Sequence, residues 1–281
     1  MVEVRVGTLN AYKGSRKTYP LLKRFAEEEN LDVLGIQEAN GWHSFKFEDF
    51  IGVGGLDYAV FGNTRTPFKL VTYSRRSIRR SQVHTSAFWH GAIESTIQIN
   101  GRLLRHWNTH FDPFNEDKRL SEAAFIVERA VKRIRHAQQA RDTIVCGDLN
   151  SPAEDGYSQL LAQRLPPDRV ARYFDDQGNL RHDATDYLKE HGFIDAAAQV
   201  GILENTFPAR TDTEPHPQAM RLDYMFVSRD LGDSILKVEV VKNDLTAAIS
   251  DHFPVITTMN ISAPAHLSHQ HLESAPILQA A

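Results

Sequence analysis

The chain has 281 residues, of which 41% are hydrophobic and 24% charged, with 36 acidic and 32 basic residues and a formal net charge of −4. This composition excludes a chain that is disordered throughout, and the mild negative charge argues against a protein that coats nucleic acid by bulk electrostatics. No apolar run approaches the roughly 20 residues that span a bilayer, and no signal peptide is apparent, so we expect no membrane anchor. The single cysteine, Cys146, cannot form an internal disulfide, and we expect a cytoplasmic protein that is monomeric by default.

The first part of the chain combines predicted strands with one helix. Its apolar periodicity predicts a strand, a helix and a second strand at residues 2–9, 20–29 and 31–38. Further strands are predicted at residues 56–62, 68–74, 92–99 and 103–110. Asn100–Gly101, between the last two strands, is a typical hairpin turn. These elements indicate an α/β domain whose sheet is mixed or antiparallel.

The second part of the chain continues with a long helix and more strands. Residues 116–139 carry apolar side chains at helical spacing, which predicts an amphipathic helix packed on a sheet. We then expect a strand, a helix and three strands at residues 143–150, near 153–163, and at 221–228, 235–241 and 254–261. The stretches 166–181 and 208–221 contain several prolines and are predicted to be surface loops. We expect one domain over residues 1–262 and a poorly ordered tail at 263–281.

Polar side chains stand at the ends of many predicted strands. They are Asn10, Glu38, His110, Asp148, Asn150, Asp223, Asp251 and His252. Strand ends of a layered α/β protein meet along one edge of the sheets, so these side chains can line one pocket. With four carboxylates and no cysteine, such a pocket suits Mg²⁺ or Mn²⁺ better than zinc, and its histidines can transfer a proton or stabilise negative charge. Neither a Walker glycine loop nor a Gly-x-Ser-x-Gly elbow occurs, which counts against nucleoside triphosphatases and serine hydrolases.

Each of these residues also has an ordinary structural explanation. Asn10 is a typical turn residue, and Asp148 or Asn150 could cap a following helix. Asp223 could simply pair with Arg221. The separate explanations would all have to hold at once, so the joint occurrence of these residues favours a site.

The same residues fall in short motifs that resemble those of the endonuclease/exonuclease/phosphatase family. This family includes pancreatic-type deoxyribonucleases, exonuclease III-like apurinic endonucleases, inositol polyphosphate 5-phosphatases and sphingomyelinases. In chain order the motifs are Thr8-Leu9-Asn10, Ile36-Gln37-Glu38, Asn108-Thr109-His110, Gly147-Asp148-Leu149-Asn150, Arg221-Leu222-Asp223-Tyr224 and Ser250-Asp251-His252-Phe253-Pro254-Val255. The resemblance spans residues 2–262 and implies a four-layer α/β sandwich, with two mixed β-sheets packed face to face and helices on both outer faces.

The resemblance also implies which residues bind metal and activate water. Glu38, with help from Asn10 and Asp251, looks like the principal Mg²⁺ site, where Mn²⁺ is a substitute to be tested. Asp148 and Asn150 are similar to the pair that aligns or deprotonates the attacking water, and they are candidates to contact a second cation. The number of metal ions stays open.

The two histidines are expected to act on the phosphate. The resemblance implies that Asp223 polarises His252, which then stabilises the pentacovalent phosphate or transfers a proton. His110 stands where relatives carry either His or Tyr, and a role at the leaving group is a hypothesis. The family's asparagine shortly after this position has no obvious counterpart. Asp112 and Asn115 follow instead, and either could face the phosphate.

We therefore expect a Mg²⁺-dependent phosphoesterase that hydrolyses a phosphodiester by direct attack of water, with a nuclease as one form of it. In this family the loops determine the substrate. Relatives specific for abasic DNA tend to have Gly-Trp before the fifth motif, whereas this chain has Thr206-Phe207-Pro208. This difference argues against a function in base-excision repair. The alternatives are a phosphomonoesterase, or a phosphodiesterase for lipid or small-molecule esters, using the same site. A non-catalytic binding protein of the same fold is more remote, because every expected ligand position holds a competent side chain.

Two further features have both a functional and a structural interpretation. One is a run of arginines, Arg75, Arg76, Arg79 and Arg80. The run could bind a phosphate backbone or form a solvated face. Three tryptophans could stack on bases, although packing is the commoner use, and these are Trp42, Trp89 and Trp107.

Overall fold

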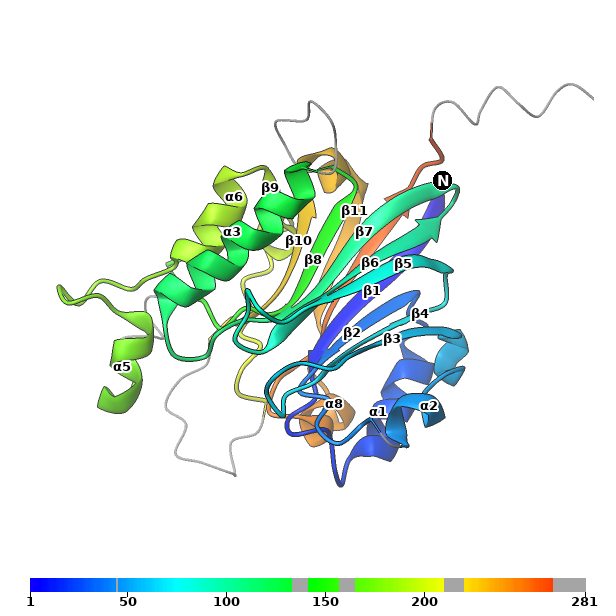
Figure 1. The fold of residues 1–281 in the computed structure, drawn as a ribbon, viewed down its shortest axis with the longest axis horizontal. Coiled ribbons are helices and arrows are strands. Elements are labelled where there is room, and N and C mark those ends of the chain that lie inside the picture. Colours follow the sequence, from blue (N-terminus) through cyan, green and yellow to red (C-terminus); the bar gives the residue numbers. More distant parts are fainter. Residues whose placement is uncertain (44, 133–140, 157–164, 210–219, 265–281) are drawn as a thin grey trace, which may run out of the picture.

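The computed structural model describes residues 1–281 except 44, 133–140, 157–164, 210–219 and 265–281. Two six-stranded sheets pack face to face, with helices on the outer face of each (Figure 1). The expected four-layer α/β sandwich is therefore confirmed. The predicted tail at 263–281 falls almost entirely outside the described residues. No helix in the described ranges is both long and apolar enough to cross a bilayer.

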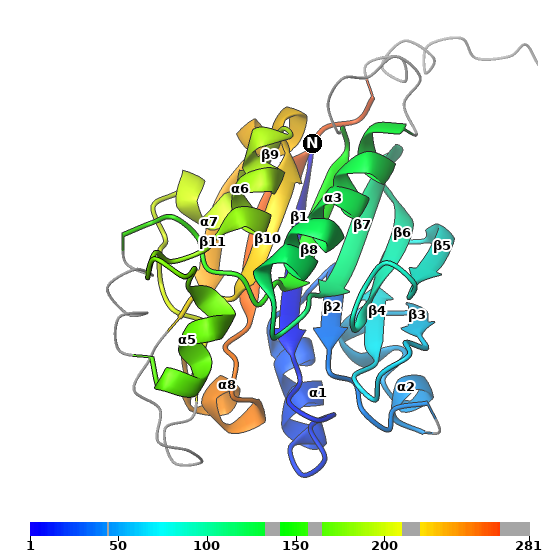
Figure 2. The same ribbon diagram turned by 60° about the vertical axis from the view of Figure 1, so that its left-hand side comes forward.

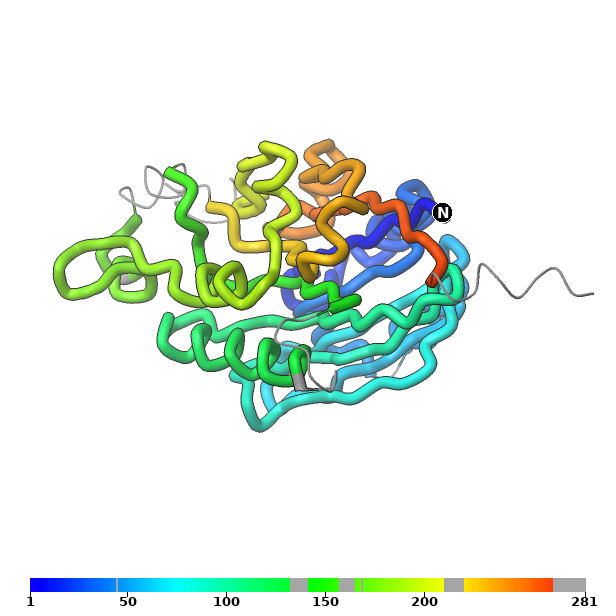
Figure 3. The backbone as a smooth tube through the Cα atoms, turned by 90° about the horizontal axis from the view of Figure 1, so that it is seen from above, coloured from blue at the N-terminus to red at the C-terminus, as the bar shows by residue number. Residues whose placement is uncertain are grey.

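The first sheet has the strand order β11-β12-β1-β2-β4-β3. Its strands, in that order, are Ile235–Val240, Val255–Ile261, Val2–Asn10, Val33–Gln37, Leu70–Ser74 and Tyr58–Gly62. β1 and β2 are parallel and the other neighbours antiparallel. Val2 pairs with Ile261, so the first and last strands lie side by side, as the blue and red parts of the tube in Figure 3 show.

The second sheet has the strand order β5-β6-β7-β8-β10-β9. Its strands, in that order, are Ile78–His84, Gly91–Ile99, Arg102–His110, Thr143–Asp148, Asp223–Ser228 and Phe193–Asp195. Only β7 and β8 are parallel among these described neighbours. Ile99 pairs with Arg102 across Asn100 and Gly101, which both have positive φ, so the predicted hairpin is confirmed. Both sheets are mixed, as expected.

Apolar helix faces cover the two sheets on their outer sides (Figure 2). The helices and 3₁₀ turns near the first sheet are α1 (Tyr19–Glu28), α2 (Lys46–Asp49), η1 (Val53–Gly55) and α8 (Asp244–Ile249). Those near the second sheet are α3 (Glu116–Lys132), α5 (Pro167–Tyr173), α6 (Asp183–Glu190), α7 (Ala196–Gln199) and η2 (Arg229–Ser234). Leu22 and Phe25 of α1 pack in the first outer core, and Ile126 of α3 in the second, while Val6 and Cys146 lie between the sheets.

One loop prediction was wrong, and one strand was not predicted. The predicted loop at 166–181 contains α5, which begins after Pro166 with a proline in its first turn and buries Tyr173 against Met220 and Leu222. The charged stretch after residue 75 contains strand β5, which pairs with β6. Its polar sequence does not predict a strand, because the stabilising hydrogen bonds come from β6. The helix expected near 153–163 falls largely on residues outside the described ranges.

Candidate active site

Three of the expected site residues lie in one row across the second sheet. His110 ends β7, Asp148 ends β8 and Asp223 begins β10, and Asp148 pairs with the other two on either side. All three side chains are buried. The row depends on Gly147, which has a φ of 143° and where a Cβ would lie 1.9 Å from the carbonyl oxygen of Thr109. Glycine therefore allows β8 to approach β7 immediately before Asp148.

The first sheet supplies Asn10 and Glu38 at the ends of parallel strands β1 and β2. The Asn10 amide nitrogen donates to Asp148 Oδ2 at 3.0 Å and to Glu38 Oε1 at 3.3 Å, so it links carboxylates from both sheets. Glu38 has a φ of 53°, in the left-handed region that costs a residue other than glycine about 1–2 kcal/mol. Its other oxygen accepts the backbone N–H of Lys13 at 2.8 Å. Such strain persists where surrounding contacts fix it and is common at functional sites.

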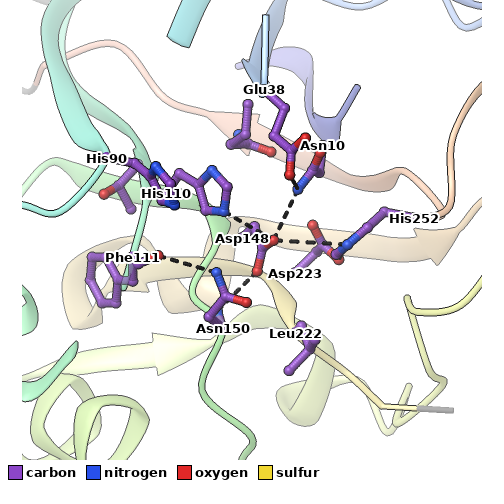
Figure 4. Close-up of polar contacts among 12 residues, drawn as sticks. Asn10, Glu38, His90, His110, Phe111, Asp148, Asn150, Leu222, Asp223 and His252 are labelled. Carbon is purple, nitrogen blue, oxygen red and sulfur yellow. Dashed lines mark hydrogen bonds and ion pairs between the residues drawn. The ribbon is translucent and has the colours of Figure 1, made fainter. Parts of the chain in front are cut away.

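His252 forms a buried pair with Asp223. Its Nδ1 lies 2.7 Å from Asp223 Oδ2, and its Nε2 lies 3.9 Å from Asp148 Oδ2 (Figure 4). Burial alone would lower the pKa of His252, but the Asp223 and Asp148 carboxylates raise it well above its ordinary value. Burial also raises the pKa of Asp148 and of Asp223, and the His252 charge opposes this. The arrangement keeps His252 as an imidazolium beside the Asp148 carboxylate.

His110 differs from His252 because no carboxylate holds its charge as tightly. Its Nε2 lies 3.5 Å from Asp148 Oδ2, while its ring stacks on His90 with centroids 4.2 Å apart. Burial, and then the positive charge of His252, lower the pKa of His110 to about 3. Burial, and then His110, lower the pKa of His90 to about 2. Both rings are therefore neutral near pH 7, and Figure 4 shows them side by side.

Asn150 contacts Asp148 directly, whereas Asp251 lies at the edge of this centre. The backbone N–H of Asn150 donates to Asp148 Oδ1 at 2.9 Å, and its side-chain nitrogen donates to the carbonyl of Phe111 at 3.1 Å. Asn150 also has a left-handed φ of 48°. Asp251 is half-buried, and its charge contributes to raising the pKa of Glu38, for which burial is the larger cause.

Six of the eight expected residues line one cavity of about 410 Å³. They are Asn10, Glu38, His110, Asp148, Asn150 and His252. Asp223 lies behind His252, and Asp251 is not among the described lining residues. The cavity continues away from these polar groups along residues that sequence analysis did not assign to the site, namely Thr66, Pro67, Phe68, Trp89, His90, Pro113 and Phe114.

A buried polar network between the two sheets supports the strands that carry the site residues. Gln37 Nε2 donates to Asn108 Oδ1 at 2.7 Å and to Thr8 Oγ1 at 3.0 Å, and Asn108 Nδ2 donates to the carbonyl of Val71 at 2.8 Å. These buried groups fix the distance between β2 and β7 immediately behind Glu38 and His110. Gln37 and Asn108 belong to the quoted motifs, so their signal was present, but their supporting function was missed.

Two hydroxyl groups hold the segments that carry Asp223 and His252. Thr206 Oγ1 accepts the backbone N–H groups of Leu222 and Asp223 at 3.0 and 3.1 Å. Ser250 Oγ donates to the Asn10 carbonyl at 2.6 Å and accepts the His252 N–H at 3.2 Å. Thr206 precedes Asp223 by 17 residues, so sequence spacing gave no signal for this contact.

Asp112 and Asn115 are turn residues in this structure. Asp112 Oδ1 accepts the backbone N–H groups of Phe114 and Asn115 at 2.7 and 2.9 Å. Asn115 Oδ1 accepts the backbone N–H of Lys118 at 3.2 Å, in the first turn of α3. Both side chains thus stabilise the start of the helix, and the contacts described for them do not favour either as a phosphate ligand.

The arginine run lies at the opposite end of the first sheet from Glu38. Ser74, just before the run, pairs with Val33 at the start of β2, whereas Glu38 follows the end of β2. Arg76 forms an ion pair with Asp32 at 2.9 Å, and Arg75 donates to the Gly54 carbonyl at 2.7 Å. These arginines therefore do not face a phosphate held in the cavity.

The three tryptophans divide by burial. Trp42 and Trp107 are fully buried in the two outer cores, as the packing interpretation expects. Trp89 lines the cavity and is 51% exposed. Trp89 alone of the three is therefore placed to contact a bound molecule.

The arrangement of these motifs on two mixed sheets agrees with comparison to known proteins. The profile of the endonuclease/exonuclease/phosphatase family matches residues 7–252. The chain belongs to this family. Its members hydrolyse phosphate esters and depend on metal, so this endonuclease/exonuclease/phosphatase protein is a phosphoesterase. No curated protein sequence matches it significantly.

Solved structures share the fold of this family member at low sequence identity. An AP endonuclease from Archaeoglobus fulgidus is 18% identical with a TM-score of 0.66, covering 92% of this chain and 100% of its own. A 3′ phosphatase from Neisseria, bound to a product DNA hairpin, is 15% identical with a TM-score of 0.67 and the same coverages. A mannosyl-6-phosphatase from Bacteroides thetaiotaomicron is 14% identical with a TM-score of 0.63, again with coverages of 92% and 100%. Proteins with different substrates thus share this architecture.

The residues present fit a divalent cation. Asp148, Asp223 and His252 form a buried group whose ligand atoms lie within 4.8 Å of one another. Because the His252 imidazolium has no free lone pair and is paired with Asp223, Asp148 is the metal ligand that this group offers. Glu38 adds a further carboxylate, whereas no lysine or arginine is among the described residues that line the cavity. Because one imidazolium cannot balance three neighbouring carboxylates, the centre carries excess negative charge. Oxygen ligands with excess negative charge are the preferred environment of Mg²⁺ and Mn²⁺.

Proposed function

We propose that this protein is a Mg²⁺-dependent phosphodiesterase that hydrolyses its substrate by direct attack of water, with polynucleotides as the first substrate class to test. The observation that carries the proposal is the convergence on one cavity of Glu38 and Asp148 with the imidazolium of His252. A phosphate ester needs its charge neutralised and its attacking water activated, and this set of groups supplies both functions.

Glu38 and Asp148 are the proposed metal-binding carboxylates. Glu38 has hydrogen-bond donors from Asn10 and Lys13 only among the described contacts, which leaves lone pairs available. The Asn10 Oδ1 atom accepts the N–H of Tyr12 at 3.0 Å, so its contacts favour Asn10 as a donor that aligns both carboxylates. Asn150 and Asp251 remain proposed contributors at the edge of this site. A bound divalent cation would neutralise phosphate charge as a Lewis acid.

Asp148 is the proposed acceptor of the water proton. Burial raises the pKa of its carboxyl group, which makes the carboxylate a stronger base than an exposed aspartate. Asn10 and the Asn150 N–H hold one oxygen each, which fixes the orientation of the carboxylate. The water would attack phosphorus directly, without a covalent bond between protein and phosphate.

His252 and His110 are proposed to act on the phosphate oxygens. The imidazolium of His252, held by Asp223, donates to a non-bridging oxygen and stabilises the charge that builds up during attack. Neutral His110 donates from Nε2 towards the leaving-group oxygen. Its neutral state allows donation without a second positive charge in the cavity.

The test is nicking of supercoiled plasmid at low salt in Mg²⁺ or Mn²⁺ buffer, with EDTA and the His252→Ala variant as controls. We expect nicking that requires metal and that the variant loses. Release of inorganic phosphate from small monoesters, without nicking, would replace the proposal by a phosphomonoesterase. Absence of hydrolysis of polynucleotide, lipid and small-molecule esters by metal-loaded protein would overturn it.

A further inference from the structure

The outer half of the cavity differs chemically from the centre described above. Its lining is largely aromatic, with Phe68, Trp89, His90 and Phe114. The described lining contains no lysine or arginine. A flat uncharged ring would find aromatic faces and edges in this half of the cavity.

Trp89 and Phe114 are unusually exposed for large aromatic residues next to a buried centre. Their side chains are 51% and 52% exposed, and the rings meet edge to face with centroids 6.0 Å apart. Covering these rings with an apolar group would release free energy in proportion to the area removed from water. The Arg172 guanidinium lies over the Phe114 ring, 5.3 Å from its centroid. The pair therefore offers a ligand the exposed surface of Trp89 and the part of Phe114 that Arg172 does not cover.

Phe68 and His90 connect this half of the cavity to the proposed catalytic centre. The Phe68 ring meets the edges of His90 and His110, with centroids 4.8 and 6.3 Å apart, and His90 stacks on His110. The His90 Nδ1 is held by Thr66 Oγ1 at 2.9 Å. A group bonded to a phosphate beside His110 would therefore lie along these two rings.

Hydrogen bonds fix the backbone that carries the Trp89 and Phe114 rings. Buried Glu122 of α3 accepts the N–H of Trp89 at 2.7 Å and, through its other oxygen, the N–H of Asp112 at 2.8 Å. Asp112 in turn accepts the N–H of Phe114. A single helix residue thus fixes the two loops that carry the rings, which reduces the entropy lost when a ligand binds.

From these contacts we infer that the outer half of the cavity is an aromatic-ring subsite, which selects phosphate esters whose organic group carries a planar uncharged ring next to the phosphate. The inference rests on the proposed phosphodiesterase function of the same site. A nucleobase and a phenyl group share this chemistry. The ring would lie among Phe68, Trp89 and Phe114 while the phosphate meets His110 and His252.

The kinetic test compares a dithymidine phosphodiester with an analogue in which one thymine is replaced by hydrogen. The scissile phosphate is the same in both. We expect the complete dinucleotide to have a kcat/KM about tenfold higher or more, the size of one base-stacking contact. Trp89→Ala and Phe114→Ala should lower this ratio towards one, whereas Trp89→Phe should retain most of it. Tyr58→Ala, at an exposed aromatic residue opposite Ser74, is the matched control and should leave the ratio unchanged.

A binding test is independent of catalysis. Because Trp42 and Trp107 are buried, Trp89 is the tryptophan placed to report a ligand. In the presence of Mg²⁺, phenylphosphonate and a thymidine 5′-phosphonate should quench its fluorescence at concentrations about tenfold or more below methylphosphonate, and Trp89→Phe should remove the signal. The ratio of the first two distinguishes a nucleobase from a phenyl group.

The outcomes separate the subsite from the proposed function. Hydrolysis of both dinucleotides at equal efficiency, with equal affinity for ring-bearing and ring-free phosphonates, would overturn the subsite and leave the phosphodiesterase intact. Ring-selective quenching without hydrolysis of any diester would support the subsite and overturn the phosphodiesterase.

Discussion

Charged side chains gather at both ends of the sheets, but the carboxylates at the centre of the site lack the arginine partners that are found at the far end. At the far end, where β2 and β7 begin, Asp32 pairs with Arg76 at 2.9 Å and Asp230 with Arg102 at 3.1 Å. At the site end, where β2 and β8 finish, Glu38 and Asp148 have amide and N–H donors but no arginine among their described contacts. Paired charges are typical of a structural role, whereas an excess of buried negative charge favours the binding of a cation.

The largest expected difference between the ends is in catalysis. Asp148→Ala is expected to lower turnover at least about 10³-fold, because it removes the proposed base and a proposed metal ligand. Asp32→Ala at the far end should change turnover less than about twofold, while it removes a buried partner of Arg76 and costs about 1–3 kcal/mol of stability. Steady-state kinetics and urea unfolding of both variants measure this. Comparable turnover of Asp148→Ala and the wild type would refute the assignment.

The next largest effect concerns Glu122, which anchors the loops at the site end. Burial raises its pKa to about 8, although two backbone N–H groups favour the carboxylate. The folded state therefore holds this proton more tightly than the unfolded chain. The stability contribution is full below the ordinary pKa of 4.5 and is lost as the pH rises to about 8.

We accordingly expect the unfolding free energy of the wild type, minus that of Glu122→Gln, to fall by about 3 kcal/mol between pH 5 and pH 8. Exposed Glu27→Gln serves as the control and should follow the wild-type pH dependence. Urea unfolding at several pH values gives these differences. A constant difference across the range would show that Glu122 does not titrate as stated.

Mg²⁺ should raise the free energy of unfolding only through the carboxylates at the site end. At a Mg²⁺ concentration of ten times Kd, binding adds about 1.4 kcal/mol to the unfolding free energy and raises Tm by about 3 °C. Glu38→Gln should lose most of this rise, and Asp32→Asn should keep it, as measured by calorimetric scans with Mg²⁺ or EDTA. An equal rise in both variants would place the cation elsewhere.

The smallest effect is expected at the arginine run. Arg76→Ala removes a partly exposed ion pair and should cost less than about 1 kcal/mol of stability. Because the run lies away from the cavity, kcat/KM on a polynucleotide should stay within about twofold of the wild type. A large rise in KM with unchanged kcat would instead indicate that nucleic acid reaches the far end.

The sequence by itself indicated the main strands, the long helix and the candidate site residues. Alternating or continuous apolar runs identify β1, β2, β7 and β8, and the polar residues that end them stand out because a carboxylate after a buried strand needs a partner. The order of the motifs then indicated the family and, with it, the four-layer fold. Elements with weak periodicity were missed, such as β5 and α5, because hydrogen bonds and contacts to distant residues stabilise them.

Only the tertiary structure decided how these residues meet. The register of β7, β8 and β10 places His110, Asp148 and Asp223 in one row, and no local sequence property specifies register between strands so far apart. The different charge states of the two histidines likewise follow from burial and neighbouring carboxylates rather than from residue type. The aromatic half of the cavity joins side chains from three separate loops, so it exists only once the sheets have packed.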